Sequence, residues 1–239
     1  CPCGAIRQDA AGGPVVDAGT CKRCGRCVDA CDYNAVIFDG RLIDNVELLK
    51  ELEADITFYT ASGGGVTFSG GEPLDQSAFV AEVCEGLRHR AIHTAVETAL
   101  CVEWSDVERL LPVVDLFIVD IKSVDSEWHR HGTGADGSIV IDNFRKLAER
   151  LKGTGRIWPR FTLVPGYSEE DEVRKAAEFY RSVDPDLKLE LMNFNPLAAS
   201  KYKSLRCAEY EFYDCVSPYT EERLAAFRKA ANDAGVDVV

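Results

Sequence analysis

The sequence has no long apolar run and few basic residues. None of its hydrophobic stretches approaches the ~20 consecutive apolar residues that a helix needs to cross a bilayer, so we expect no membrane contact. The chain has 27 Lys and Arg residues against 40 Asp and Glu residues, and its formal net charge is −13. Nucleic-acid phosphates require a basic surface, so this charge argues against a nucleic-acid partner.

Methionine is nearly absent, and no secretory signal pattern is present. The single methionine is Met192, whereas residue 1 is Cys1, so we expect the printed chain to be an N-terminally truncated fragment. Cysteine, in contrast, is abundant, with ten residues. Ten cysteines without an export signal indicate a reducing compartment, the cytoplasm, in which thiolates are kept for metal binding.

Four cysteines form a run with the spacing C-x2-C-x2-C-x3-C, namely Cys21, Cys24, Cys27 and Cys31. Bacterial ferredoxins bind a [4Fe-4S] cluster with this run, because the short gaps let several thiolates surround one cluster. A structural zinc site is the alternative, although zinc sites favour two separated Cys pairs and often His. Disulfides are a third possibility. The run therefore predicts iron–sulfur binding and electron transfer.

The pattern C-x3-A-[IV] occurs twice, beginning at Cys1 and again at Cys31. In two-cluster ferredoxins, each half ends with a cysteine that ligates the cluster of the other half. We therefore expect Cys1 to complete the cluster held by the first three cysteines of the run. Cys31 would then belong to a second cluster whose other ligands lie upstream. Cys3 is the alternative ligand to Cys1.

Residues 1–40 are accordingly predicted to be the C-terminal part of a ferredoxin-like 4Fe-4S insert, and residues 41–239 to be a larger α/β domain. In the second part, short apolar runs alternate with helical patterns such as residues 139–152 and 221–234. This alternation predicts a parallel sheet with right-handed crossovers. Five or six units are fewer than the eight of a closed barrel, which favours an open partial barrel. The expected strands are residues 66–69, 94–97, 116–121, 157–164, 188–192 and 236–239.

A second motif, Ser-Gly-Gly-Glu-Pro at residues 69–73, follows the first of these strands. Glycines at this position let a ligand approach the backbone, and the carboxylate of Glu72 can accept a hydrogen bond from an ammonium group. A Gly-rich loop alone is weak evidence, because turns are commonly Gly-rich. The complete motif directly after a strand predicts a ligand-binding loop made of Gly70, Gly71 and Glu72.

With the ferredoxin cysteines, these residues resemble the glycyl radical enzyme activating enzymes of the radical SAM superfamily. Pyruvate formate-lyase activating enzyme is a relative of this kind that lacks the insert. The matching positions are residues 62–73, residues 115–122, His129, Thr133, Gly134, Asn143, residues 160–168, Lys201 and Tyr202. The resemblance implies a partial (β/α)6 radical SAM barrel for residues 41–239, without the first strand and its C-x3-C-x2-C loop.

For function, the resemblance implies an oxidoreductase that cleaves S-adenosylmethionine reductively and installs a glycyl radical on a partner enzyme under anaerobic conditions. Family members generate a 5′-deoxyadenosyl radical at a [4Fe-4S] cluster. The full-length protein would hold up to three such clusters and would receive electrons from a flavodoxin or ferredoxin. Two alternatives stay open: a radical SAM enzyme that acts directly on a small molecule, and a ferredoxin-like electron-transfer protein without its own catalysis.

The resemblance also implies the roles of individual residues. The loop of residues 70–72 would bind the methionine amino group of S-adenosylmethionine. Asp120 and Lys122 end a strand at the functional face of the barrel, where the Lys122 ammonium suits the methionine carboxylate. Glu97, Thr98 and Asp120 correspond to a monovalent-cation site, which is rich in oxygen ligands. The structural alternatives are a solvated strand end for Lys122 and a helix cap for Glu97.

The chain departs from the family at two points. Asn195 replaces a His that contacts S-adenosylmethionine in relatives, and an amide can still form hydrogen bonds but cannot carry a positive charge. The C-x3-C-x2-C motif of the catalytic cluster is absent from the printed residues, so we expect this fragment to be inactive. His129 and His131 lie in a region that relatives use to face the partner, and a plain surface role is the alternative for either. The cysteines outside the N-terminal region are expected to be buried structural thiols: Cys84, Cys101, Cys207 and Cys215.

Overall fold

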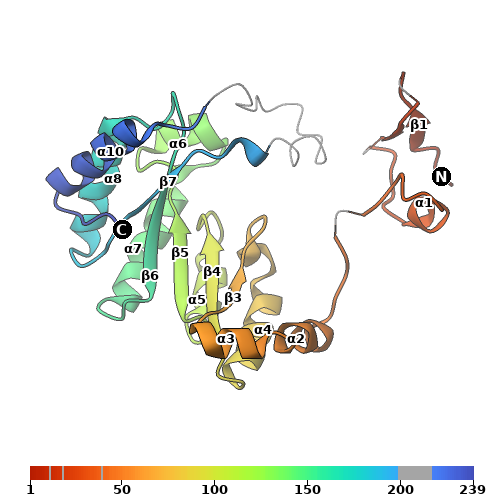
Figure 1. Ribbon diagram of the computed structural model, residues 1–239, viewed down its shortest axis with the longest axis horizontal. Helices are drawn as coiled ribbons and strands as arrows, with labels where there is room; N and C mark the ends of the chain where they lie inside the picture. Colours follow the sequence, from red (N-terminus) through yellow and green to blue (C-terminus); the bar gives the residue numbers. More distant parts are fainter. Residues whose placement is uncertain (11, 18, 39, 199–216) are drawn as a thin grey trace. The chain divides into compact units, whose positions relative to one another are not determined.

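The computed structural model describes residues 1–10, 12–17, 19–38, 40–198 and 217–239. It divides into two compact units, Cys1–Asp44 and Asn45–Val239, and each is described by itself. The sequence placed residues 41–44 in the larger domain, whereas the structure includes them in the smaller unit. Figure 1 shows both units in the colours of the sequence.

The smaller unit contains a two-stranded antiparallel hairpin and one short helix. β1 (Ile6–Gln8) pairs with β2 (Pro14–Val16), and α1 (Arg26–Asp29) lies within the cysteine run. Among the described residues of this unit, Ala5 is the only fully buried side chain. Chains of about 40 residues with so little apolar core usually need disulfides or metal for stability, and the cysteines of this unit are free thiols. The predicted cluster would supply the stability that such a small core lacks.

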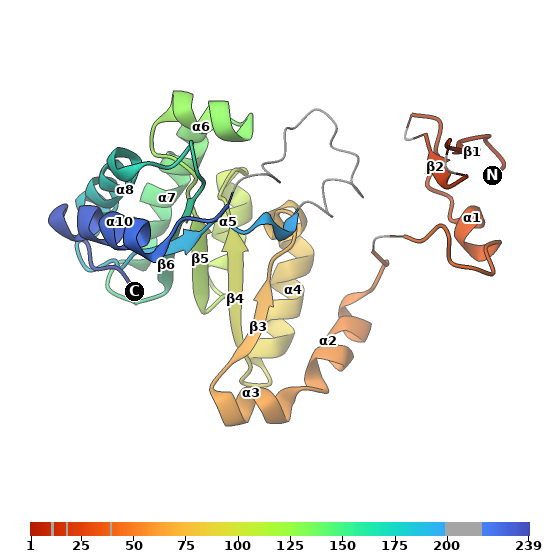
Figure 2. The same cartoon turned by 45° about the horizontal axis from the view of Figure 1, so that its top comes forward.

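The larger unit is built on a parallel sheet whose strands follow one another in chain order. The strands are β3 (Gly65–Phe68), β4 (His93–Thr98), β5 (Leu116–Asp120), β6 (Ile157–Leu163) and β7 (Glu190–Asn193). They match the first five predicted strands, with ends that differ by one or two residues, and Figure 2 shows them side by side. Sequential order with right-handed crossovers places the connecting helices on one face of the sheet, as in a partial barrel.

Helices precede, connect and follow these strands. They are α2 (Asn45–Glu53), α3 (Ile56–Ser62), η1 (Pro73–Gln76), α4 (Ser77–Arg88), α5 (Trp104–Leu110), α6 (Ser126–Thr133), α7 (Gly137–Leu151), α8 (Glu170–Val183), η2 (Pro196–Ala198) and α10 (Glu221–Asp233). Among the described residues, no helix is long and apolar enough to span a bilayer.

The two faces of the sheet differ in burial, which locates the core. In β5, Phe117 and Val119 are fully buried on the face that packs against the helices, while Ile118 and Asp120 are half-buried on the opposite face. This second face, which we call the inner face, also carries Arg160 of β6. Because side chains alternate along a strand, charged residues reach the inner face without entering the core.

The two helices that the periodicity predicted are confirmed, with clear physical reasons for their ends. In α7, Val140, Phe144 and Leu147 are fully buried on one stripe. In α10, Gly235 adopts a left-handed φ of 84° directly after the helix, and the Val236 N–H donates to the carbonyl of Ala231. This arrangement is the Schellman motif, which glycine favours because it has no Cβ.

The sixth predicted strand, residues 236–239, is wrong. The structure has only an isolated parallel bridge between Leu189 and Val238, with the Val239 N–H donating to the Leu189 carbonyl at 3.1 Å. Val236 is buried and belongs to the glycine turn that ends α10. Only the residues after it can therefore lie beside the start of β7. A single bridge does not make a strand.

Candidate functional site

A cavity of about 540 Å³ lies at the carboxyl ends of β3, β4 and β5. Its lining residues are Ser69, Gly70, Gly71, Glu72, Asp75, Glu97, Thr98, Ala99, Cys101, Asp120 and Lys122. Ligands of parallel α/β sheets bind at this edge, and the volume is in the usual range for small-molecule sites. Every site residue that the sequence assigned to the larger unit lines this cavity, with the exception of Asn195.

The glycine-rich loop leaves its backbone open toward the cavity. Gly70 has a φ of 118°, and a Cβ added at Gly70 or Gly71 would meet no protein atom within 4 Å. The next residue, Glu72, caps η1 by accepting a hydrogen bond from the Leu74 N–H at 3.1 Å. Its other carboxylate oxygen accepts from the Ala99 N–H at 3.0 Å. Glu72 therefore ties the loop after β3 to the loop after β4.

Lys122 is held at the cavity by two neighbours. Its ammonium forms an ion pair with Asp120 and donates to the Thr162 hydroxyl at 3.2 Å. The Thr162 hydroxyl also lies 3.2 Å from a carboxylate oxygen of Asp120. An ammonium group has three N–H donors, so these two contacts leave one donor for an anionic group of a ligand. Lys122 is thus a fixed cation rather than a freely solvated strand end.

An ion-pair network crosses the inner face beside the cavity. The Arg160 guanidinium donates to Glu97 of β4 at 2.6 Å and to Glu190 of β7 at 2.7 Å. Burial by itself lowers the pKa of Arg160, but the hydrogen bond and charge of Glu190, with the charge of Glu97, raise it overall. Arg160 therefore stays charged and compensates two carboxylates that the strands place on the same face.

All three residues of the predicted monovalent-cation set already have protein partners. The Glu97 carboxylate is paired with Arg160, and the Thr98 hydroxyl, which is buried, accepts a hydrogen bond from the Leu100 N–H at 2.9 Å. Asp120 is paired with Lys122. The cation site stays a prediction, and its ligands would have to include groups other than these engaged side chains.

Asn195 and His129 have structural roles that the sequence did not predict. The Asn195 side chain accepts a hydrogen bond from the Leu197 N–H at 3.0 Å and so caps η2. His129 is buried, and its Nδ1 lies 3.2 Å from the Ala135 carbonyl, so the expected partner-facing position does not apply to it. His131 is exposed and packs against the Trp128 ring at 5.0 Å.

The cysteines of the larger unit fall into two groups. Cys84 is fully buried, as predicted, and burial raises the pKa of its thiol to about 12. Cys101 is exposed and lines the cavity, so the prediction of a buried thiol is wrong there. Its place just after β4, at the carboxyl edge of the sheet, was the signal that sequence reasoning missed. Cys207, Cys215, Lys201 and Tyr202 lie outside the described residues.

The sequence repeat in the smaller unit is also a structural repeat. The Ala5 N–H donates to the Cys1 sulfur at 3.3 Å, and the Ala35 N–H donates to the Cys31 sulfur at 3.2 Å. Backbone N–H groups, of which that of Tyr33 contributes most, lower the pKa of Cys31. Cys1 and Cys31 therefore accept the same backbone N–H contact, from the residue four positions along, in the two copies of the repeat.

The structure does not gather the thiols of the cysteine run into a metal site. Within the part of the chain that it describes, no three Cys, His, Asp or Glu side chains form a group that could hold a metal ion. The sulfur of Cys3 lies 3.8 Å from that of Cys1. Thiol ligands with N–H···S hydrogen bonds suit an iron–sulfur cluster chemically, and ligand sites of this kind commonly assemble only when metal binds.

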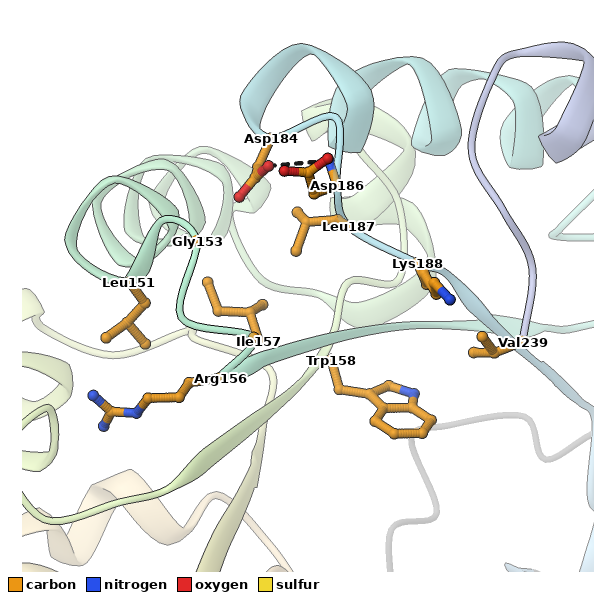
Figure 3. A pocket seen from close by; sticks show the side chains of 11 residues that line it. Leu151, Gly153, Arg156, Ile157, Trp158, Asp184, Asp186, Leu187, Lys188 and Val239 are labelled. Atoms are coloured by element: carbon orange, nitrogen blue, oxygen red, sulfur yellow. Dashed lines mark hydrogen bonds between the residues drawn. The ribbon is translucent and has the colours of Figure 1, made fainter.

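A second cavity, of about 370 Å³, lies at the opposite ends of the strands (Figure 3). Its lining includes Trp158 of β6, Lys188 just before β7, and Val239, which lie near one another in the figure. None of the predicted site residues is among its lining residues. Amino ends of parallel strands are not where ligands of such sheets usually bind, so the carboxyl-end cavity is the candidate site.

Comparison with known proteins identifies the family. The family model described as "Radical SAM superfamily" matches residues 23–179. This chain belongs to the radical SAM superfamily. S-adenosylmethionine and a 4Fe-4S cluster are therefore the cofactors of its family, and the carboxyl-end cavity lies within the matched residues.

Three relatives of this radical SAM chain are activating enzymes of glycyl radical enzymes. It is 36% identical over 192 residues to the isethionate sulfite-lyase activating enzyme of Oleidesulfovibrio alaskensis, which is 80% of this chain and 61% of that protein. It is 32% identical over 216 residues to the 4-hydroxyphenylacetate decarboxylase activating enzyme of Clostridioides difficile, covering 90% and 67%. It is 34% identical over 189 residues to the pyruvate formate-lyase-activating enzyme of Staphylococcus aureus, covering 76% and 74%. The chain spans 61–66% of the length of the isethionate-type relatives.

Solved structures confirm the fold of this radical SAM chain. A domain of pyruvate-formate lyase-activating enzyme from Bacteroides vulgatus superposes with a TM-score of 0.58 at 24% identity, covering 74% of this chain and 98% of that one. A radical SAM methyltransferase from Sphaerobacter thermophilus gives a TM-score of 0.62 at 14% identity, covering 83% and 57%. The α/β partial barrel predicted from the sequence is thereby confirmed.

Proposed function

We propose that this chain is the S-adenosylmethionine-binding part of a glycyl radical enzyme activating enzyme. The observation that carries the proposal is the charge of the carboxyl-end cavity. Its lining side chains include four carboxylates and one ammonium group, and Arg160, behind the lining, compensates one of the carboxylates, Glu97. S-adenosylmethionine has a sulfonium, an ammonium and a carboxylate, and so a net charge of about +1 at neutral pH. A negative cavity with one fixed cation complements this ligand.

The residues present divide the binding work among themselves. The open backbone at Gly70 and Gly71 gives the methionine amino end room to approach the loop. The remaining N–H of the Lys122 ammonium donates to the methionine carboxylate. Asp120 orients Lys122 and keeps its charge in place. When bound at a reduced cluster, S-adenosylmethionine supplies a 5′-deoxyadenosyl radical, which takes hydrogen from a glycine.

The smaller unit is proposed to carry electrons to the catalytic site. Cys21, Cys24 and Cys27, together with Cys1, would hold one 4Fe-4S cluster, and Cys31 would ligate another. The support is the cysteine spacing and the matching N–H···S contacts at the two repeats. A flavodoxin or ferredoxin would be the donor, in the cytoplasm. The full protein would hold up to three clusters.

The protein substrate is proposed to be a glycyl radical enzyme. Support comes from the relatives, which are named for three different partner enzymes: isethionate sulfite-lyase, 4-hydroxyphenylacetate decarboxylase and pyruvate formate-lyase. The proposal therefore names a class of partner and leaves its small-molecule substrate unassigned.

The experiment compares the 239-residue chain with a form extended upstream by a C-x3-C-x2-C segment. Both are reconstituted with iron and sulfide under anoxia and reduced. They are then mixed with S-adenosylmethionine and with the glycyl radical enzyme encoded by the neighbouring gene. We expect 5′-deoxyadenosine and a glycyl radical resonance from the extended form only. An extended form that makes 5′-deoxyadenosine but transfers no radical to the partner would refute the activase proposal. Formation of 5′-deoxyadenosine by the 239-residue chain would refute the need for the upstream motif.

A further inference from the structure

We propose that Asn143 is a positioning residue for the carboxyl-end cavity. It fixes the turn of residues 98–102 after β4, and through this turn it holds Glu72 and the glycine-rich loop. The inference deepens the proposed function and rests on it, because the ligand of the cavity is taken to be S-adenosylmethionine.

Asn143 forms two hydrogen bonds to the turn of residues 98–102. Asn143 belongs to α7 and is buried among apolar side chains, with 2% of its surface exposed. Its side-chain N–H groups donate to the Leu100 carbonyl at 3.0 Å and to the Val102 carbonyl at 2.8 Å. One amide group therefore satisfies two backbone acceptors of the same turn, and no apolar side chain can replace it.

These hydrogen bonds hold Leu100 in a left-handed backbone conformation. Leu100 has a φ of 56° and a fully buried side chain. A bulky residue in the left-handed region is unfavourable and persists where its surroundings fix it. Asn143 holds the carbonyl of Leu100, and the Thr98 hydroxyl accepts from its N–H at 2.9 Å. The turn is thus held on both sides of its strained residue.

Ala99 and Glu72 connect this turn to the cavity. The Ala99 N–H of this turn donates to the Glu72 carboxylate at 3.0 Å, and the other oxygen of that carboxylate accepts from the Leu74 N–H. The same turn places Ala99 and Cys101 on the cavity lining. If Leu100 relaxes out of the left-handed region, the Ala99 N–H moves away from Glu72, and the glycine-rich loop loses its support.

The test uses the whole 239-residue chain with Asn143→Leu, which keeps the branched arrangement of side-chain heavy atoms and removes both donors. The matched control is Val140→Ala, a fully buried position on the same helix without a hydrogen bond to the turn. S-adenosylmethionine affinity is measured by calorimetry, and exchange of the Ala99 amide is measured by NMR. We expect Asn143→Leu to weaken affinity by about tenfold or more and to expose the Ala99 amide. Val140→Ala should stay within about twofold of the unmodified chain.

A purely structural role for Asn143 predicts something else. In that case both variants lower the melting temperature, but the folded Asn143→Leu protein binds S-adenosylmethionine as the control does and keeps the Ala99 amide protected, which overturns the proposal. If Asn143→Leu does not fold, Thr98→Val removes the other hydrogen bond to Leu100 and must show the same two effects. If the unmodified chain does not bind S-adenosylmethionine, the proposed function fails, whereas Ala99 exchange still tests the link to Glu72.

Discussion

Individual side chains at the carboxyl-end cavity either bind the ligand or support the loops, and the role of each depends on its neighbours. Glu72 was predicted as a ligand-facing carboxylate, yet both of its oxygens accept backbone N–H groups from two loops. Lys122, in contrast, is paired on one side and open on the other. The residue types at the site could be read from the sequence, whereas the division between binding and support depends on tertiary neighbours.

Cys84 and Cys101 are expected to differ in reactivity because only one is exposed. With iodoacetamide at pH 8, Cys101 should be alkylated in the native protein, whereas Cys84 should react only after unfolding, since both burial and a pKa near 12 suppress its thiolate. Peptide mass spectrometry of native and unfolded samples measures this. Equal modification of both cysteines in the native protein would contradict the placement of Cys84 in the core.

Stability should fall at alkaline pH partly because of Cys84. Burial raises the pKa of its thiol from 9.0 to about 12, so the folded state favours the protonated form. The stabilisation is complete below pH 9 and is lost as pH rises from 9 toward 12. Melting temperatures of the unmodified chain should therefore drop more steeply across this window than those of Cys84→Ala. Parallel pH profiles of the two proteins would count against this contribution.

At the scale of elements, chain order and periodicity were sufficient to predict the sheet, because each strand pairs with its neighbour in sequence. The same reasoning failed for residues 236–239, since apolar content alone does not reveal that a glycine turn takes Val236 into a cap contact. Chain order and periodicity also did not predict α6, because its position depends on contacts with a turn distant in the sequence. The Trp128 indole donates to the Tyr167 carbonyl at 3.0 Å, and the Tyr167 hydroxyl donates to the Trp128 carbonyl at 2.8 Å.

Gly132 of α6 offers a test of this packing. Alanine normally stabilises a helix by up to about 1 kcal/mol relative to glycine. Here a Cβ at Gly132 would lie 2.3 Å from the Tyr167 ring, so we expect Gly132→Ala to lower stability, by about 1–3 kcal/mol for an overpacked contact. Thermal or urea unfolding measures the change. Combining Gly132→Ala with Tyr167→Ala should remove the clash, so a double variant with additive losses would speak against this contact.

At the scale of the whole molecule, the chain combines two units with different sources of stability. The larger unit has an extensive apolar core that includes Phe117, Phe144 and Phe161, whereas the smaller has a single fully buried side chain among its described residues. The cysteine spacing made this division predictable. The exact ligand sets were not, because the spacing alone leaves both Cys1 and Cys3 as candidates for the fourth ligand.

Cluster loading should follow the repeat. In the chain reconstituted with iron and sulfide, Cys1→Ser should lose most of the charge-transfer absorption of the cluster, while Cys31→Ser should keep it. Cys3→Ser is the control for the neighbouring thiol and should also keep the absorption. Iron content and visible spectra provide the readout. A cluster that survives Cys1→Ser and disappears in Cys3→Ser would instead identify Cys3 as the ligand.

We propose that the carboxyl-end cavity binds S-adenosylmethionine through Lys122. Calorimetric titration of the 239-residue chain tests it, with Lys122→Gln compared against Lys188→Gln, which changes the matching charge at the opposite cavity. We predict that Lys122→Gln weakens binding by about tenfold or more, as expected for loss of a charge-assisted hydrogen bond, and that Lys188→Gln leaves it within about twofold. Equal affinities for the two variants, or a larger loss with Lys188→Gln, would show that Lys122 does not hold the ligand.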